Sequence, residues 1–203
     1  MGVRVFPSSS ASACPFAALL LVALLSVACS HVVYQPAPVI PTKSPLPFSA
    51  KVKITEVASY MVEPGATMVA DPRIENRVTG TSGSVDPAKK QWEKSIADYL
   101  VDRKTFTYVS LDSQADLDLT LRLNIYIDPG VLFKFNHVYV ARIDASLVSP
   151  RSGQTIGYMG YGKAPGEVSR GGAADDRAPI NQAVQGALND LFEKIEQDPR
   201  LRR

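Results

Sequence analysis

Few residues of this chain have the type and spacing that metal or thiol chemistry requires. Its two histidines, His31 and His137, lie more than a hundred residues apart, and its two cysteines are Cys14 and Cys29. No HExxH pair and no clustered set of ligands is present in the sequence. Zinc sites need three or four such ligands at short spacings, so we expect no metal and no cofactor.

Asp116 and Asp118 are the remaining candidates for catalysis. They lie two residues apart on one face of an expected strand, which separates their Cα atoms by about 7 Å. Two carboxylates are what a glycosidase uses, so a cell-wall hydrolase is one possible function. Carboxylates are also the ordinary polar side of an alternating strand, and Arg122 lies nearby. We favour that second interpretation and expect no enzyme.

Cys29 follows a stretch that gives it a different role. Residues 16–27, FAALLLVALLSV, form an apolar run preceded by a single charge, Arg4, and followed by the small residue Ala28. The run is shorter than the about 20 residues that a membrane-spanning helix needs, and it fits the hydrophobic region of a secretory signal. A basic start, an apolar run and a small residue directly before cysteine resemble the bacterial lipoprotein signal, with Ser26 where leucine is usual.

This resemblance implies that residues 1–28 are a signal peptide and that Cys29 becomes the acylated, diacylglyceryl-modified first residue of the mature chain. The mature protein would then be held on a membrane, facing the periplasm. Ser30 is not the aspartate that the resemblance associates with retention in the inner membrane, so we expect the outer membrane. An ordinary secretory signal cleaved near Ala28 is the alternative, and it would leave a free thiol.

The charge balance of the mature chain excludes one class of partner. Residues 1–28 hold one of the 22 basic residues and none of the 20 acidic ones, which leaves a formal net charge of +1. Nucleic-acid binding requires a clustered basic face, so we expect no nucleic-acid partner. The oligomeric state is left open by the sequence.

Residues 29–50 read as the lipidated cysteine and a proline-rich tether. The segment holds five of the fifteen prolines. Proline fixes φ and has no backbone N–H, so an extended chain with a reach of about 60 Å is expected. The alternative is that part of the segment packs along the domain, because Val33, Tyr34 and Phe48 are apolar.

Residues 51–203 are predicted to form a single periplasmic α+β domain. Alternation with a period of two predicts strands over residues 51–57, 105–111, 115–128, 137–148 and 154–162, and apolar stripes predict helices over 86–104 and 178–197. Two amphipathic helices and a sheet with one wet face are best satisfied when both helices cover one face. We therefore expect one antiparallel sheet, mainly a meander of about four or five strands, with two helices on one side.

This order of elements behind a lipoprotein signal resembles small periplasmic accessory lipoproteins of envelope assembly and transport systems. The stretch SLVSPRSGQTIGYMGYG, residues 146–162, resembles a strand–turn–strand of uncharacterised lipoproteins. The resemblance implies a binding or accessory subunit of a cell-envelope machine, with an envelope protein as its partner. A small lipid- or glycan-binding carrier or sensor is the alternative, and it predicts an apolar cavity between helices and sheet.

Two groups of residues are candidates for the partner contact. Apolar residues gather at an expected hairpin tip, and four tyrosines lie on neighbouring strands. Exposed apolar clusters and tyrosines are both typical of interfaces, although the tip could equally join the core. The candidates are Val131, Leu132, Phe133 and Phe135 at the tip, and Tyr126, Tyr139, Tyr158 and Tyr161 on the sheet.

Overall fold

The computed structural model describes residues 34–61, 83–84, 89–128, 138–166 and 177–202. The elements follow the chain in the order strand, short strand, helix, four strands, helix. Their bounds are β1 (Leu46–Met61), β2 (Gly83–Ser84), α2 (Lys89–Arg103), β3 (Phe106–Ser110), β4 (Leu117–Asp128), β5 (Val138–Val148), β6 (Thr155–Pro165), α3 (Arg177–Gln197) and the 3₁₀ turn η3 (Pro199–Leu201).

The strands form one mixed sheet with the order β2-β1-β4-β5-β6, and β3 pairs with the first part of β1, on the edge opposite β4 that β2 joins farther along. The α+β class and the two helices are confirmed. The antiparallel meander is right for β4, β5 and β6, but wrong for β1, which runs parallel to both β3 and β4. The cause is α2, because a helix that returns the chain to the start of a neighbouring strand makes the two strands parallel.

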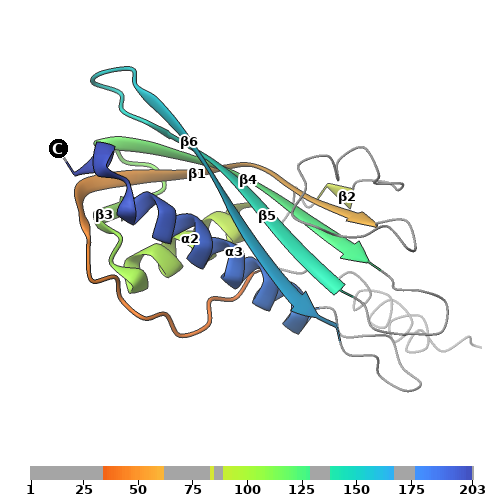
Figure 1. The fold of residues 1–203 in the computed structure, drawn as a ribbon. Helices are drawn as coiled ribbons and strands as arrows, with labels where there is room; N and C mark the ends of the chain where they lie inside the picture. The colour runs from red at the N-terminus through yellow and green to blue at the C-terminus, as the bar shows by residue number, and fades with distance from the viewer. Residues whose placement is uncertain (1–33, 62–82, 85–88, 129–137, 167–176, 203) are drawn as a thin grey trace, which may run out of the picture. The chain divides into compact units, whose positions relative to one another are not determined.

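Both helices lie on one face of the sheet, as Figure 1 shows. The apolar stripe of α2, with Trp92, Ile96, Tyr99 and Leu100, is fully buried. The odd-numbered residues of β4 from Leu117 to Ile125 face the same core. Burial of these stripes supplies the main driving force for folding.

The helix α3 lies unusually close to β6. A Cβ atom added at Gly162 would be 1.9 Å from the carbonyl oxygen of Ala183, and one at Gly160 would be 2.2 Å from that of Ala187. No side chain fits in that space. Two glycines of the GYMGYG stretch therefore let the helix settle on the strand.

Residues 34–45 cross the helices as an extended segment, which we name the strap (Figure 1). Its first residue, Tyr34, is fully buried, stacks near Trp92 with the ring centroids 6.3 Å apart, and donates its hydroxyl to Gln185 Oε1. The backbone N–H of Gln35 donates to Asn181 Oδ1 (3.1 Å). From Tyr34 onward the proline-rich segment therefore packs along the domain, which was the alternative to a free tether. Residues 46–50 of that segment already belong to β1.

The carboxylate of Glu196 fastens the far end of the strap. It accepts hydrogen bonds from the guanidinium of Arg103 (2.8 and 3.0 Å), from Thr105 Oγ1 (2.7 Å) and from Thr42 Oγ1 (2.8 Å). Glu196 is 5 % exposed, and a buried carboxylate is tolerated only when it is paired and hydrogen-bonded in this way. One side chain therefore joins the strap, α2, α3 and the residue that precedes β3.

Candidate functional site

The face of the sheet opposite the helices is the candidate site, and we name it the open face. No helix of the described residues lies on it (Figure 1). Strand register sets its side chains in rows, one of which joins Ala58, Asn124, Arg142 and Tyr161 across β1, β4, β5 and β6. The adjacent row joins Glu56, Arg122, Asp144 and Met159.

Arginines and carboxylates alternate across the centre of the open face. Arg122 Nε lies 2.8 Å from Glu56 Oε2, and both side chains are about half exposed. Arg142 pairs with Asp144 at 3.0 Å and is more enclosed. An exposed pair such as Arg122–Glu56 contributes little to stability.

Asn124 lies at the centre of the open face and is the unusual residue there. It is 1 % exposed, and among the described residues neither its Nδ2 nor its Oδ1 has a hydrogen-bond partner. Leaving a buried amide unpaired costs roughly 1–3 kcal/mol, and such a group in a native structure requires an explanation.

Tyr161, two strands away from Asn124 in the same row, is the aromatic residue of the open face that remains partly accessible. It is half-buried, and burial raises the pKa of its hydroxyl while the charge of Arg142 lowers it. Met159, 38 % exposed, lies on the same strand and face. Tyrosine, methionine and arginine are the side chains enriched at protein interfaces.

The four tyrosines that we proposed from the sequence do not share a face. Tyr126 and Tyr161 lie on the open face by register, but Tyr126 is 2 % exposed, so only Tyr161 is accessible there as we predicted. Tyr139 is 1 % exposed in the core, and Tyr158 packs against that core with its hydroxyl 2.6 Å from Asp198 Oδ2. Tyr139 and Tyr158 are therefore structural, which corrects the prediction for those two residues.

The other predicted site residues lie outside the described residues. Cys29 is one, and Val131, Leu132, Phe133 and Phe135 are the others. The strands that flank the predicted tip are paired to their ends, with Asp128 opposite Val138. Lipidation and the role of the tip stay predictions.

Asp116 and Asp118 do not converge on a shared site. Asp116 Oδ2 accepts from the backbone N–H (3.0 Å) and the hydroxyl (2.7 Å) of Ser49, and these bonds lower its pKa. β3 and β4 flank opposite edges of β1, so the chain crosses β1 between them, and the Ser49–Asp116 contact secures that crossing. Asp118 lies on the open face opposite Lys51, as the polar-strand interpretation expects.

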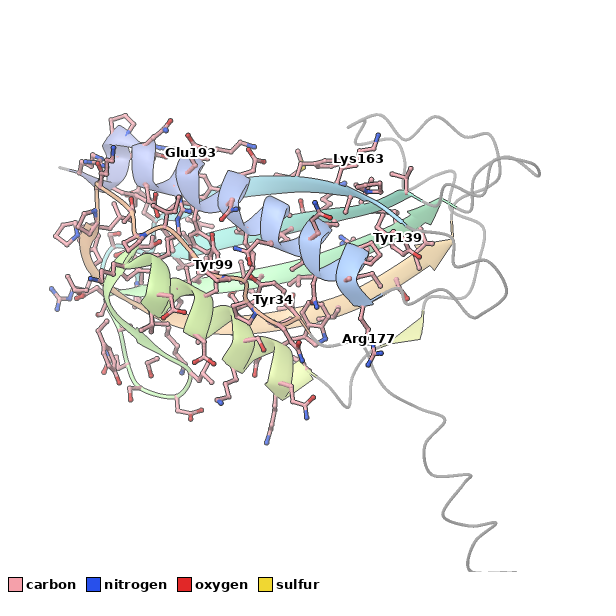
Figure 2. All side chains as sticks on the ribbon, turned by 90° about the horizontal axis from the view of Figure 1, so that it is seen from below. Tyr34, Tyr99, Tyr139, Lys163, Arg177 and Glu193 are labelled. Carbon is pink, nitrogen blue, oxygen red and sulfur yellow. The ribbon has the colours of Figure 1, made fainter. Side chains whose placement is uncertain are left out.

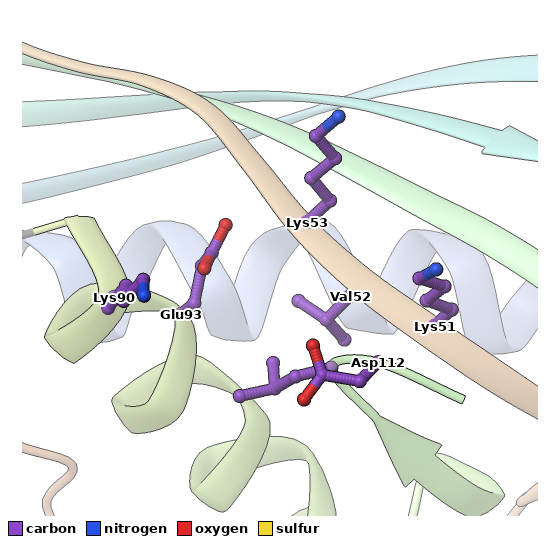
Figure 3. A pocket seen from close by; sticks show the side chains of 7 residues that line it. Lys51, Val52, Lys53, Lys90, Glu93 and Asp112 are labelled. Atoms are coloured by element: carbon purple, nitrogen blue, oxygen red, sulfur yellow. The ribbon is translucent and has the colours of Figure 1, made fainter.

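Two polar grooves lie beside β1. One, of about 400 Å³, lies between β1 and α2 and is lined by Lys51, Val52, Lys53, Lys90, Glu93, Leu111 and Asp112. In Figure 3 its lysine ammonium groups do not converge on one point, and Glu93 is engaged as the acceptor for the N–H of Ile54 (3.0 Å). The other, of about 330 Å³, has Asp116 and Arg151 in its lining. Neither groove assembles a nucleophile, a base and an orienting group.

Among the described residues, no three histidine, cysteine or acidic side chains are grouped so that they could hold a metal ion. No helix in that part of the chain is long and apolar enough to cross a membrane.

Alternation in the sequence predicts that Asn124 lies on the polar face of β4, but it does not show that the residue is buried. It also does not identify Arg142 or Met159 as residues of the candidate site. Their significance comes from register, because Asn124 and Arg142 become neighbours only when β4 pairs with β5.

No known protein family matches the chain, and no curated protein matches it. Solved structures with a similar course of the chain include a Xanthomonas campestris protein of the DUF330 family (15 % identity, TM-score 0.44, 82 % of this chain and 90 % of that one). Another is a neuraminyllactose-binding hemagglutinin homolog from Helicobacter pylori (15 % identity, TM-score 0.45, 85 % and 95 %). At these values the function has to be argued from the chain's own residues.

Proposed function

We propose that this protein is a lipid-anchored periplasmic domain that acts by binding a protein partner of the cell envelope through its open face. The anchor is Cys29, on the outer membrane, as the lipoprotein signal and Ser30 imply. The role is that of an accessory subunit, without catalysis of its own.

The observation that carries the binding role is the unpartnered amide of Asn124 in a face rich in tyrosine, methionine and arginine. The amide is shielded from solvent, and its nitrogen and oxygen have no hydrogen-bond partner in the described part of the chain. A partner that offers a donor and an acceptor there would recover that free energy, after the neighbouring side chains move to admit it. Neither of the two grooves beside β1 presents a group that, like the amide of Asn124, would gain a hydrogen bond by binding a small ligand.

Replacing Asn124 by Leu separates binding from folding. Leucine has nearly the same size and no polar group, so the free energy of unfolding should stay unchanged or rise by about 1 kcal/mol, as urea titration would measure. Partner recovery after purification from membranes should fall. A variant that loses stability and keeps its partner would assign Asn124 a purely structural role.

A second variant tests the exposed part of the face. Met159→Ser with Tyr161→Ser removes two partly exposed side chains of the open face, and Gln182→Ser, at an exposed position of α3, is the matched control. We expect the open-face variant alone to lose a stoichiometric envelope protein. Equal recovery from both variants would contradict the proposal.

The anchor is tested separately by intact mass. Full-length protein expressed in a Gram-negative host should yield a mature species that starts at Cys29 and carries acyl chains, and Cys29→Ser should yield none. A mature species without acyl mass would refute the lipid anchor and leave the open-face test unaffected.

A further inference from the structure

The direction of the strap is the observation from which a further inference follows. Tyr34 contacts Trp92, the fourth residue of α2, and Gln185, in the first half of α3. Thr42 contacts Arg103, the last residue of α2, and Glu196, in the last turn of α3. The strap therefore begins beside the N-terminal halves of both helices and leaves at the end of the domain where both finish.

Tyr34 is a firm first attachment point. It is fully buried and lies between the two helices in Figure 2, and its hydroxyl donates to Gln185 Oε1. The backbone N–H groups of Gln35 and Ala37 donate to Asn181 Oδ1 (3.1 Å) and to Gln185 Oε1 (3.2 Å). Pulling it out would expose an aromatic ring and break all three hydrogen bonds. The chain before it therefore cannot lengthen without that cost.

Only four residues lie between Cys29 and Tyr34, so five Cα–Cα steps join them. A fully extended chain covers at most about 3.3–3.6 Å per residue. The segment of residues 30–33, which we name the leash, can therefore hold Cys29 no more than about 18 Å from Tyr34. The whole proline-rich segment would have reached about 60 Å. A domain on so short a leash has to stay against the surface to which Cys29 is attached.

We infer that the end of the domain where α2 and α3 begin lies against the lipid bilayer, and that the opposite end points away from it. This inference rests on the lipid anchor proposed above. The opposite end carries the hairpin of residues 149–154 and η3. α3 alone has 21 residues, which at 1.5 Å each places that end about 30 Å farther from the membrane.

The chemistry of the near end suits lipid headgroups but does not set the orientation. The first turns of both helices contain no acidic residue, and Lys89, Lys90 and Arg177 lie there. Basic side chains at helix N-termini favour headgroup phosphates. Acidic residues precede both turns in the sequence, at Asp86 and Asp176, so the leash and not the lipid charge determines which end faces the bilayer.

The test compares two labels on full-length lipidated protein. In the mature chain Cys29 is blocked, so an introduced cysteine takes a fluorophore uniquely. Lys90→Cys marks the near end and Ser152→Cys marks the far end, and both positions are exposed. Each protein is reconstituted in phosphatidylcholine vesicles, with and without phosphatidylglycerol, that contain lipids with a nitroxide on the headgroup.

We expect the label at position 90 to lose most of its emission and the label at position 152 to keep it, in both lipid mixtures. A Gly-Ser insertion of about twelve residues after His31 adds roughly 20 Å of mean reach and should remove the difference, with every contact of the strap intact. Equal quenching of the two labels in protein whose acyl mass is verified would overturn the orientation. Missing acyl mass would refute the anchor itself.

Discussion

Replacing Tyr34 by alanine tests whether the strap is a structural part of the domain. The tyrosine is fully buried between α2 and α3, and truncating such an aromatic side chain costs about 3–5 kcal/mol. Tyr34→Phe isolates the hydroxyl. Because Gln185 Oε1 keeps its bond to the N–H of Ala37, the phenylalanine variant should lose only about 1 kcal/mol.

Urea unfolding followed by the fluorescence of Trp92 and by circular dichroism measures both values. Trp92 is the sole tryptophan, is 1 % exposed and lies beside Tyr34, so a detached strap should also shift its native emission to longer wavelength. Ile40→Ala is the control within the strap, since Ile40 is 85 % exposed and its loss should change nothing. The reasoning would be refuted if Tyr34→Ala cost less than about 1 kcal/mol and left the emission unmoved.

Three further predictions concern the same framework. Glu196→Ala should cost about 3–5 kcal/mol in urea unfolding, because it leaves a buried guanidinium without its carboxylate; a loss near zero would contradict the fastening role. Gly162→Ala should lower the melting temperature strongly, since overpacking costs at least about 1–3 kcal/mol, whereas Gly157→Ala on the same strand has open space and should not; similar shifts would contradict the close approach of α3. Burial raises the pKa of Tyr99 and of Tyr158, so the folded state favours their neutral form. The contribution of these tyrosines to stability should be full below the unfolded pKa of about 10 and should fall as pH rises above it. A free energy of unfolding that does not change at alkaline pH in urea titrations would refute this.

The elements of this domain were predictable wherever one face of an element is apolar and the other is not. The stripe of α2 and the alternation of β4 both lead to the core, as expected from the 3.6 and 2.0 periodicities. The direction of β1 was not predictable in this way. A strand shows the same alternation next to a parallel or an antiparallel neighbour, and the bonds that distinguish them involve only backbone atoms.

The strap shows a second limit of composition. Its prolines correctly indicate an extended backbone without regular hydrogen bonds, but they do not show what the segment packs against. The buried residue is Tyr34, and the groove that receives it exists only once α2 and α3 are side by side. The composition therefore indicated the extended conformation, and of the two alternatives left open, packing along the domain describes residues 34–45.

The candidate site was predictable as the face that carries the polar residues of β4, but the burial of Asn124 and Tyr126 on that face was not. Val138, Tyr139, Val140 and Ala141 are consecutive apolar residues, so alternation does not decide which of them face the helices. Pairing with β4 decides it, and it turns Tyr139 inward. The same pairing brings Arg142 beside Asn124.

Photocrosslinking in intact cells from position 161 tests the central claim most directly. A benzophenone amino acid at Tyr161 reports on the open face, and the same group at Gln182 reports on the exposed side of α3. A binding role for the open face predicts one dominant envelope protein crosslinked from position 161 and none from position 182. Crosslinks to the same proteins from both positions, or from position 182 alone, would contradict it.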